Sequence, residues 1–207
     1  MRITKSVEER RTEILDVASR LFMIKGYDET STNDILDEIG IARGTLYYHF
    51  KSKEAILDAV IMRMVDNMLA EAREIANNRD IPLLDRIQGV IKALNAESKL
   101  GKEVTNQMHK PQNALLHQKV SDLLIDGVVP IITDIFEEGI DMGIFKTVYA
   151  RECAEMIMIY SNIVFDDRKM TSPEENTRRI EGFIYNIERM LGTKRGYLRE
   201  VITGIFR

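Results

Sequence analysis

The segment TSTNDILDEIGIARGTLYYHFKSKEAIL, residues 30–57, holds two short helical patterns joined by a glycine turn. The first helix is expected over 32–39, because Ser31 followed three residues later by Asp34 forms a capping-box-like start. Gly40 is placed to end this helix. The pattern therefore predicts a helix of about two turns, followed at once by a change of chain direction.

The second helix is expected over 43–50, immediately after the turn. Leu46 and Phe50 lie four residues apart on one face and are expected to point inward, with Ile41 packing just before the helix. Two short helices joined through a tight turn make a helix-turn-helix candidate. Because short helix pairs are common, the side chains of the second helix must decide whether this one binds DNA.

The second helix carries polar and aromatic side chains that core packing does not explain. Arg43 has the geometry to bind the O6 and N7 atoms of guanine, and the methyl group of Thr45 suits a thymine methyl. Gly44 leaves room for the helix backbone to approach a groove, and Lys53 stands at a helix N-terminus that favours phosphate. The competing interpretation is a solvated polar face with two half-buried tyrosines. The candidate DNA-contacting residues from this reasoning are Arg43, Gly44, Thr45, Tyr47, Tyr48, His49 and Lys53.

Helical patterns also fill the rest of the chain, so the sequence predicts an all-α fold. The stretch VVPII, residues 128–132, leaves a strand open as an alternative, although its proline argues against a central strand. A row of Ile, Val and Met residues every four positions after residue 53 indicates core packing. The other expected helices cover 7–25, 53 to the early seventies, a segment opened by Asp80 and Pro82, a bent helix over 100–118, 121–142, 148–165 and 173–191.

Composition excludes several classes of protein. The 207 residues are 44% hydrophobic and 30% charged, which is typical of one globular domain or two small ones. Cys153 is the single cysteine, so neither a disulfide framework nor a multi-cysteine metal site is expected. The charged N-terminus does not resemble a signal peptide, and no apolar run is long enough for a membrane span, so we expect a cytoplasmic protein without a membrane partner. Nucleotide-binding, hydrolase and metalloprotease motifs are absent, so no enzyme activity, cofactor or metal is expected.

The net charge of −4 argues weakly against a nucleic-acid partner. A phosphate-binding surface, however, needs only local charge. Residues 39–53 contain Arg43, Lys51 and Lys53 and no acidic residue. This local basic window is compatible with DNA binding despite the acidic whole chain.

Residues 8–57, and especially 26–57, resemble the DNA-binding domain of the TetR family of transcriptional repressors. The likeness rests on GYDETSTNDILDEIG before the turn and GTLYYHFKSK after it, and it covers roughly the first 60 residues. The resemblance implies DNA contacts at Thr32 and Asn33 as well as at the positions of the second helix and Lys53 given above. One departure is Ala42, where many members have Ser or Thr. Alanine neither caps the recognition helix nor touches phosphate, and a lost cap costs about 1 kcal/mol.

The resemblance further implies a helical C-terminal domain that binds a small ligand and dimerises. We expect a DNA-binding domain over 1–52, a connecting helix over 53–75 and a ligand-binding and dimerisation domain over 76–207. A homodimer formed through 148–165 and 173–191 would present two recognition helices to successive major grooves of double-stranded DNA. The expected operator is therefore an inverted repeat.

The part of the chain beyond the motif is longer than dimerisation alone requires, which suggests a sensor for a small molecule. A methionine- and aromatic-rich lining favours a small apolar or aromatic effector over a sugar or phosphate. The alternative function is a helical ligand- or protein-interaction module that no longer binds DNA. Most of the candidate pocket residues could individually be plain core residues; they are Met64, Met68, Met108, His109, Tyr160 and Phe165.

Overall fold

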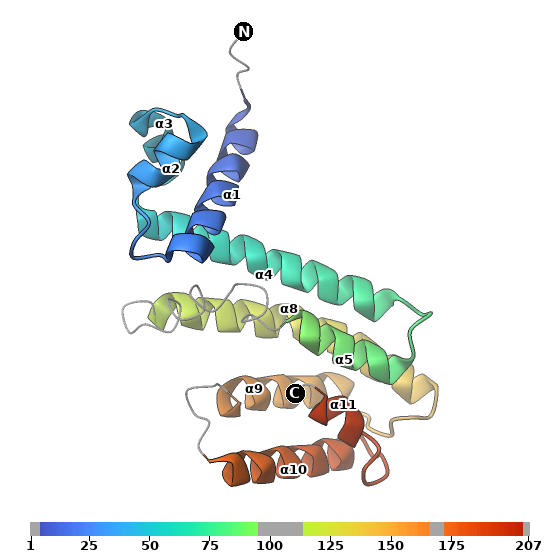
Figure 1. The fold of residues 1–207 in the computed structure, drawn as a ribbon. Coiled ribbons are helices and arrows are strands. Elements are labelled where there is room, and N and C mark those ends of the chain that lie inside the picture. The colour runs from blue at the N-terminus through green and yellow to red at the C-terminus, as the bar shows by residue number, and fades with distance from the viewer. Residues whose placement is uncertain (1–4, 95–113, 166–171, 205–207) are drawn as a thin grey trace. The chain divides into compact units, whose positions relative to one another are not determined.

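The computed structural model describes residues 5–94, 114–165 and 172–204, and the regular elements in these ranges are all helices (Figure 1). The all-α prediction is therefore confirmed. The chain divides into two compact units. Of the described residues, the first unit contains 5–67 and 114–120, and the second contains 68–94, 121–165 and 172–204.

The first unit is built from three helices and the beginning of a fourth. α1 spans Val7–Lys25, α2 spans Thr32–Ile39, α3 spans Arg43–His49, and α4, which continues into the second unit, spans Lys53–Asn77. The core of the unit joins side chains from each of these helices, because their apolar faces have no other way to leave water. The most deeply buried of them are Ile14, Ala18, Phe22, Ile35, Leu46, Ile56 and Ile61.

The start and end of α2 and the start of α3 follow from the chemistry of the residues that flank each helix. Ser31 accepts a hydrogen bond from the Asp34 amide at 3.2 Å, and the Asp34 carboxylate accepts one from the Ser31 amide at 2.7 Å. This reciprocal pair is the expected capping box. Gly40 ends α2 with φ +71°, in the left-handed region that glycine tolerates without strain. Ala42 precedes α3 without a side-chain capping bond, as its methyl group requires.

The second unit contains the later part of α4 together with α5, Leu83–Ala93, and α9, Ala150–Val164. It also contains α10, Pro173–Met190, and a short α11, Arg199–Thr203. α8, Ala114–Asp141, belongs to it from residue 121 onward.

The second unit differs from the expected helices at two places, the start of α8 and the additional α11. VVPII lies inside α8, as expected for the helix over 121–142, so the strand alternative is wrong; its proline is exposed on the helix surface. α8 begins at Ala114, so the helix expected over 121–142 starts earlier, while most of the bent helix expected over 100–118 lies outside the described residues. α11 was not expected, because five residues are too few to show a helical period.

A buried ion pair holds α5 against α8. Arg86 is 2% exposed, and its guanidinium donates to both carboxylate oxygens of Glu138, at 2.5 and 2.9 Å. The same guanidinium donates to the carbonyl oxygen of Ala76 at 2.9 Å, and Arg79 also pairs with Glu138. Burial lowers the pKa of Arg86, and the nearby Arg79 lowers it further. The carboxylate of Glu138 compensates that buried charge.

Candidate nucleic-acid interface

α3 has one buried face and one exposed face. Leu46 is 1% exposed and Phe50, which ends the helix, is 4% exposed, so both fill the core as expected. The exposed face carries Arg43, Tyr47 and Tyr48, with Tyr48 69% exposed. A tyrosine that is mostly exposed gains little from the fold, because most of its ring stays in water. The side chains expected to contact DNA therefore lie on the face of α3 that the core does not use.

Gly44 lies on this exposed face, and none of the residues that the structure describes packs over it. A Cβ atom added to Gly44 would have no neighbour within 4 Å, and the residue has no positive φ. Glycine inside a helix costs about 1 kcal/mol relative to alanine. Packing within the described residues therefore does not explain the glycine. Close approach of a partner to the backbone of α3 would explain it.

The first helix of the motif meets the second through a hydrogen bond between two predicted DNA contacts. Arg43 Nη2 donates to Asn33 Oδ1 at 3.0 Å. Asn33 is exposed and Thr32 is half-buried at the start of α2. The contact holds the guanidinium of Arg43 beside the N-terminus of α2, so the structure brings Thr32, Asn33 and Arg43 together. Thr45 and His49 lie half-exposed on α3, and the His49 ring meets Tyr48 edge-on at 5.1 Å between centroids.

Lys53 has internal partners that the sequence did not indicate. Its Nζ donates to the carbonyl oxygens of Tyr27 at 2.8 Å and Thr30 at 3.0 Å, and it lies 4.2 Å from the centroid of the Tyr27 ring. The ammonium group therefore ties the start of α4 to the loop between α1 and α2. A side chain expected only to bind phosphate also has a structural role.

Tyr27 is the residue of this region that sequence reasoning missed. It is 8% exposed, and its ring packs edge-on against Phe22 at 5.3 Å. Burial raises the pKa of Tyr27 to about 12, and the carboxylate of Glu54 adds to the shift. Tyr27 follows Gly26 directly, and this glycine–aromatic pair after a helix was the available signal.

Ion pairs surround the motif. Lys25 pairs with Asp34 at 2.6 Å, and Arg20 pairs with Glu38. The hydrogen bonds from Lys25 and Ser31 keep the pKa of Asp34 well below its ordinary value. Asp34 therefore stays ionised at the N-terminus of α2, where a negative charge is stabilising.

The predicted ligand-pocket residues fall in different places. Met64 is half-buried in the first unit, and Met68 is buried in the second. Tyr160 stacks on Phe183 at 5.3 Å between ring centroids, and Phe165 meets the same ring at 5.2 Å. The structure thus brings together Tyr160 and Phe165. Met108 and His109 lie outside the described residues.

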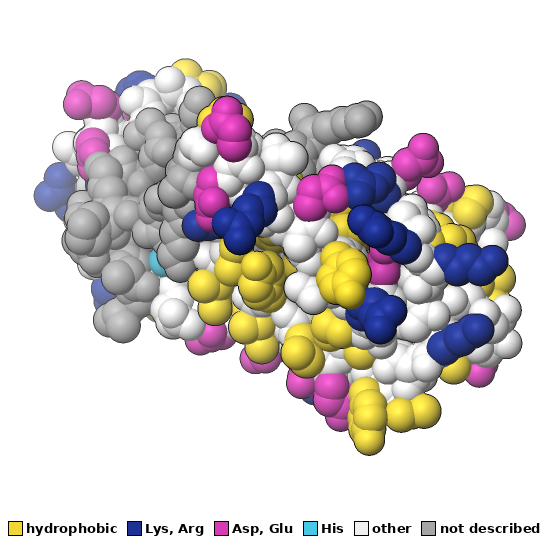
Figure 2. Space-filling model, turned by 90° about the horizontal axis from the view of Figure 1, so that it is seen from below, with side chains coloured by type: hydrophobic (Ala, Val, Ile, Leu, Met, Phe, Trp, Pro, Cys, Tyr) yellow, Lys and Arg dark blue, Asp and Glu magenta, His cyan; other side chains and the backbone are white. Residues whose placement is uncertain are grey.

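α9 presents a second apolar face to solvent. Met156, Ile159, Tyr160 and Ile163 are 44–60% exposed and follow the spacing of one helix face. On α10 the exposed side includes Tyr185. Figure 2 shows hydrophobic side chains gathered into a patch on one face of the molecule. Such a patch marks an interaction surface.

The described residues hold no group of three or more His, Cys, Asp or Glu side chains placed to bind a metal ion. Over the same ranges, no helix is long and apolar enough to cross a membrane.

A helix-turn-helix with a polar recognition face, followed by a larger helical unit, defines a class of bacterial regulator. Residues 14–60 match the profile of bacterial regulatory proteins of the tetR family, and residues 96–179 match the tetracyclin repressor-like C-terminal domain. The chain belongs to the TetR family.

Relatives and solved structures agree with this assignment. The chain is 37% identical over 92 residues to the HTH-type transcriptional repressor KstR2 of Mycobacterium tuberculosis, a match covering 44% of this chain and 46% of that protein. It is 42% identical over 72 residues to KstR2 of Rhodococcus jostii, covering 35% of each chain. These matches span less than half the length of these curated relatives. A transcriptional regulator of the TetR/AcrR family from Thermobifida fusca is 26% identical over 91% of this chain and 98% of its own, with a TM-score of 0.55.

Proposed function

We propose that the protein is a homodimeric transcriptional repressor that binds an inverted-repeat DNA operator and is released by a small apolar or aromatic effector. The observation that carries the proposal is the division of α3. Leu46 and Phe50 secure one side in the core, while Arg43, Gly44 and Tyr48 lie on the other side without a packing role. Arginine and tyrosine side chains at such a face supply phosphate and base-edge hydrogen bonds. The curated relatives named above are transcriptional repressors, which supports the same activity.

A homodimer supplies the second half of the recognition. One seven-residue helix reads only a few base pairs, whereas two related by a two-fold axis read half-sites about 34–36 Å apart or a multiple of that distance. The exposed apolar face of α9, with Tyr185 of α10, supports a contact with a second copy through the expected segments 148–165 and 173–191. Two helices from each copy would bury this face in a four-helix bundle.

The proposal also covers the domain division, the role of α4 and the place where the protein acts. The expected domain division into 1–52, 53–75 and 76–207 assigns DNA binding to the first part and effector binding to the last. α4 contributes to both compact units of the structure, and this continuity supports its proposed role as connector. A repressor of this kind acts by binding rather than by catalysis, and it works in the cytoplasm, where the operator lies.

The test is selection of operator fragments from a pool of genomic DNA, followed by gel retardation over a range of salt concentrations. Specific retardation by an inverted repeat, lost on Arg43→Ala but kept on Arg73→Ala, is expected. Arg73 is an exposed arginine of α4 and serves as the matched control. Absence of retardation even at low salt would favour the alternative of an interaction module without DNA binding, because electrostatic binding is strongest at low salt.

A further inference from the structure

The second unit contains a partly open apolar cavity of about 70 Å³. Its walls come from α5, α8, α9 and α10 and from the C-terminal segment, with Ile87, Phe136, Ile157 and Ile187 among the lining residues. Predicted pocket residues such as Tyr160 do not line it. The cavity is therefore a site that the sequence did not indicate.

The chemistry of the lining defines what the cavity accepts. Ser161 is the one residue with a side-chain hydroxyl among the lining residues, and its Oγ donates to the Met158 carbonyl at 3.1 Å. The lining side chains that the structure describes carry no charge. A charged or strongly polar ligand would lose its hydration without replacement hydrogen bonds. Apolar cavities of this kind stay dry and take up small hydrocarbons such as benzene.

One wall of the cavity is the C-terminal segment after α10. Leu198, Val201 and Ile202 line the cavity and are 3–9% exposed. The segment leaves α10 through Gly192, with φ +65°, and turns again at Gly196, with φ +83°. α11 lies against α5, where Gln88 Nε2 donates to the Val201 carbonyl at 3.2 Å. The wall is thus a short separate element rather than part of a long helix.

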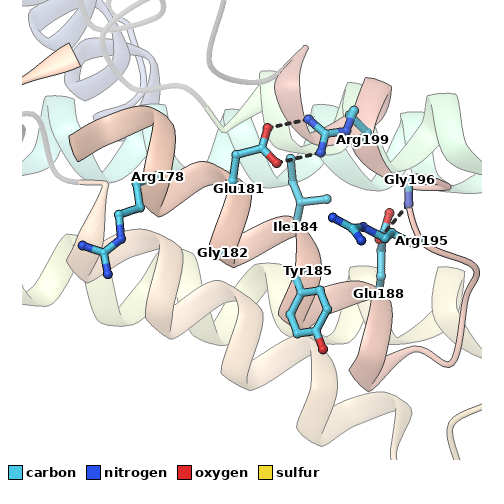
Figure 3. A pocket seen from close by; sticks show the side chains of 9 residues that line it. All are labelled: Arg178, Glu181, Gly182, Ile184, Tyr185, Glu188, Arg195, Gly196 and Arg199. Atoms are coloured by element: carbon cyan, nitrogen blue, oxygen red, sulfur yellow. Dashed lines mark hydrogen bonds and ion pairs between the residues drawn. The ribbon is translucent and has the colours of Figure 1, made fainter. Parts of the chain in front are cut away.

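Polar contacts from α10 hold this wall in place, as Figure 3 shows. Glu188 is 3% exposed, and its carboxylate accepts a hydrogen bond from the amide of Gly196 at 2.9 Å (Figure 3). It also accepts a hydrogen bond from the amide of Leu198 at 3.0 Å. Arg199 forms a two-pronged ion pair with Glu181, one contact of which measures 2.6 Å. These bonds hold the segment whose apolar side chains form this wall of the cavity.

We infer that the cavity is a binding site for a small uncharged apolar molecule and that residues 193–204 form its movable wall. Its 70 Å³ are about half of an engineered 150 Å³ cavity that accepts benzene. A ring-sized ligand therefore enters only when Leu198, Val201 and Ile202 move outward. The inference gives the proposed effector response a location, and on that point it rests on the proposed function. Binding itself is independent of DNA.

The test uses benzene as the probe, titrated into the full-length protein with methyl-labelled Ile, Leu, Val and Met. Saturable shifts of the cavity-lining methyl groups are expected. Val201→Phe, which fills the cavity, should weaken binding at least tenfold, while the matched control Val7→Phe, at a 56% exposed valine of α1, should stay within twofold of wild type. Wild-type shifts that do not saturate, or that map away from the lining, would overturn the site even if Val201→Phe failed to fold. DNA retardation by the same wild-type sample reports separately on the proposed function.

The movement of residues 193–204 is tested separately, by measuring the exchange rate of benzene from NMR line shapes. Glu188→Gln replaces one carboxylate oxygen by an amide that cannot accept a backbone hydrogen bond. Because hydrogen bonds to a charged group are among the stronger ones, exchange should accelerate about tenfold or more. Glu137→Gln, at an exposed position of α8, is the control and should leave the rate unchanged. Equal rates for Glu188→Gln and wild type would show a fixed wall and refute this part of the inference.

Discussion

Replacing Lys53 with methionine separates the structural role of this side chain from its predicted contact with DNA. Methionine keeps the length of the side chain but removes the ammonium group, which donates to the Tyr27 and Thr30 carbonyls and lies over the Tyr27 ring. Hydrogen bonds to a charged group contribute about 1.5–3 kcal/mol, and a partly exposed cation–π contact about 0.5–1 kcal/mol. The Tyr27 carbonyl keeps the Thr30 amide as a donor at 3.2 Å, which reduces the loss. We expect Lys53→Met to lower the free energy of unfolding by about 2 kcal/mol.

Urea unfolding followed by circular dichroism measures this loss, with Lys51→Met as the control at an exposed lysine two residues away. A contact made only with phosphate would leave stability unchanged and would reduce the salt dependence of DNA binding by about one charge. The reasoning is refuted if Lys53→Met and Lys51→Met unfold within about 0.5 kcal/mol of each other. DNA affinities of Lys53 variants are then compared only after correction for the folded fraction.

Four further changes test other parts of the structure. Arg43→Ala should cost about 1–3 kcal/mol at one base position of the operator, measured by competition with single-base variants, and a uniform loss across all variants would contradict base readout. In wild type, the folded state retains a tyrosine proton that the unfolded chain releases near pH 10, because the pKa of Tyr27 is raised to about 12. The free energy of unfolding should therefore fall by about 2–3 kcal/mol between pH 10 and 12, and the Tyr27→Phe variant should lack this component in urea titrations at each pH. Gly44→Ala should raise the free energy of unfolding by about 1 kcal/mol and still weaken operator binding; unchanged binding would show that nothing approaches the backbone there. Ile163→Glu, on the exposed face of α9, should convert the dimer to a monomer in sedimentation experiments, and a dimer of undiminished affinity would place the interface elsewhere.

Features set by neighbouring residues could be predicted from the sequence. The Ser31 cap forms as expected, and Ser172 caps α10 in the same way, since each cap depends on an amide three residues away. The expected start of the last long helix at Pro173 is also observed, because proline at the first helical position loses no hydrogen bond. The helices of the DNA-binding motif follow from the same local signals.

Features that join distant residues could not be predicted. Lys53 finds its carbonyl partners 23 and 26 residues earlier, and Arg86 finds Glu138 52 residues later. Neither pairing has a periodic or motif signal, since charged side chains at those positions also suit solvent. The apolar cavity depends in the same way on several helices and on a five-residue α11 that has no helical period. The sequence could therefore suggest which residue types suit a pocket, but not which of those residues lie close to one another in the fold.

The glycines inside helices fall into two groups: those where internal packing leaves no room for a side chain, and those where it does. At Gly127 an added Cβ would lie 2.4 Å from a Leu69 methyl, and at Gly139 it would lie 2.3 Å from the Phe145 ring, so internal packing explains both. At Gly44 and Gly182 an added Cβ would meet nothing within 4 Å, and neither glycine has a positive φ.

Each of these two open glycines costs its helix about 1 kcal/mol relative to alanine without a benefit inside the chain. One lies on the proposed DNA face of α3, and the other lies on the exposed side of α10, within the proposed dimer segment. At both positions the absence of a side chain on an exposed helix face lets another backbone or a DNA groove approach the helix closely. The same physical argument therefore supports the DNA surface and the dimer surface from two unrelated helices.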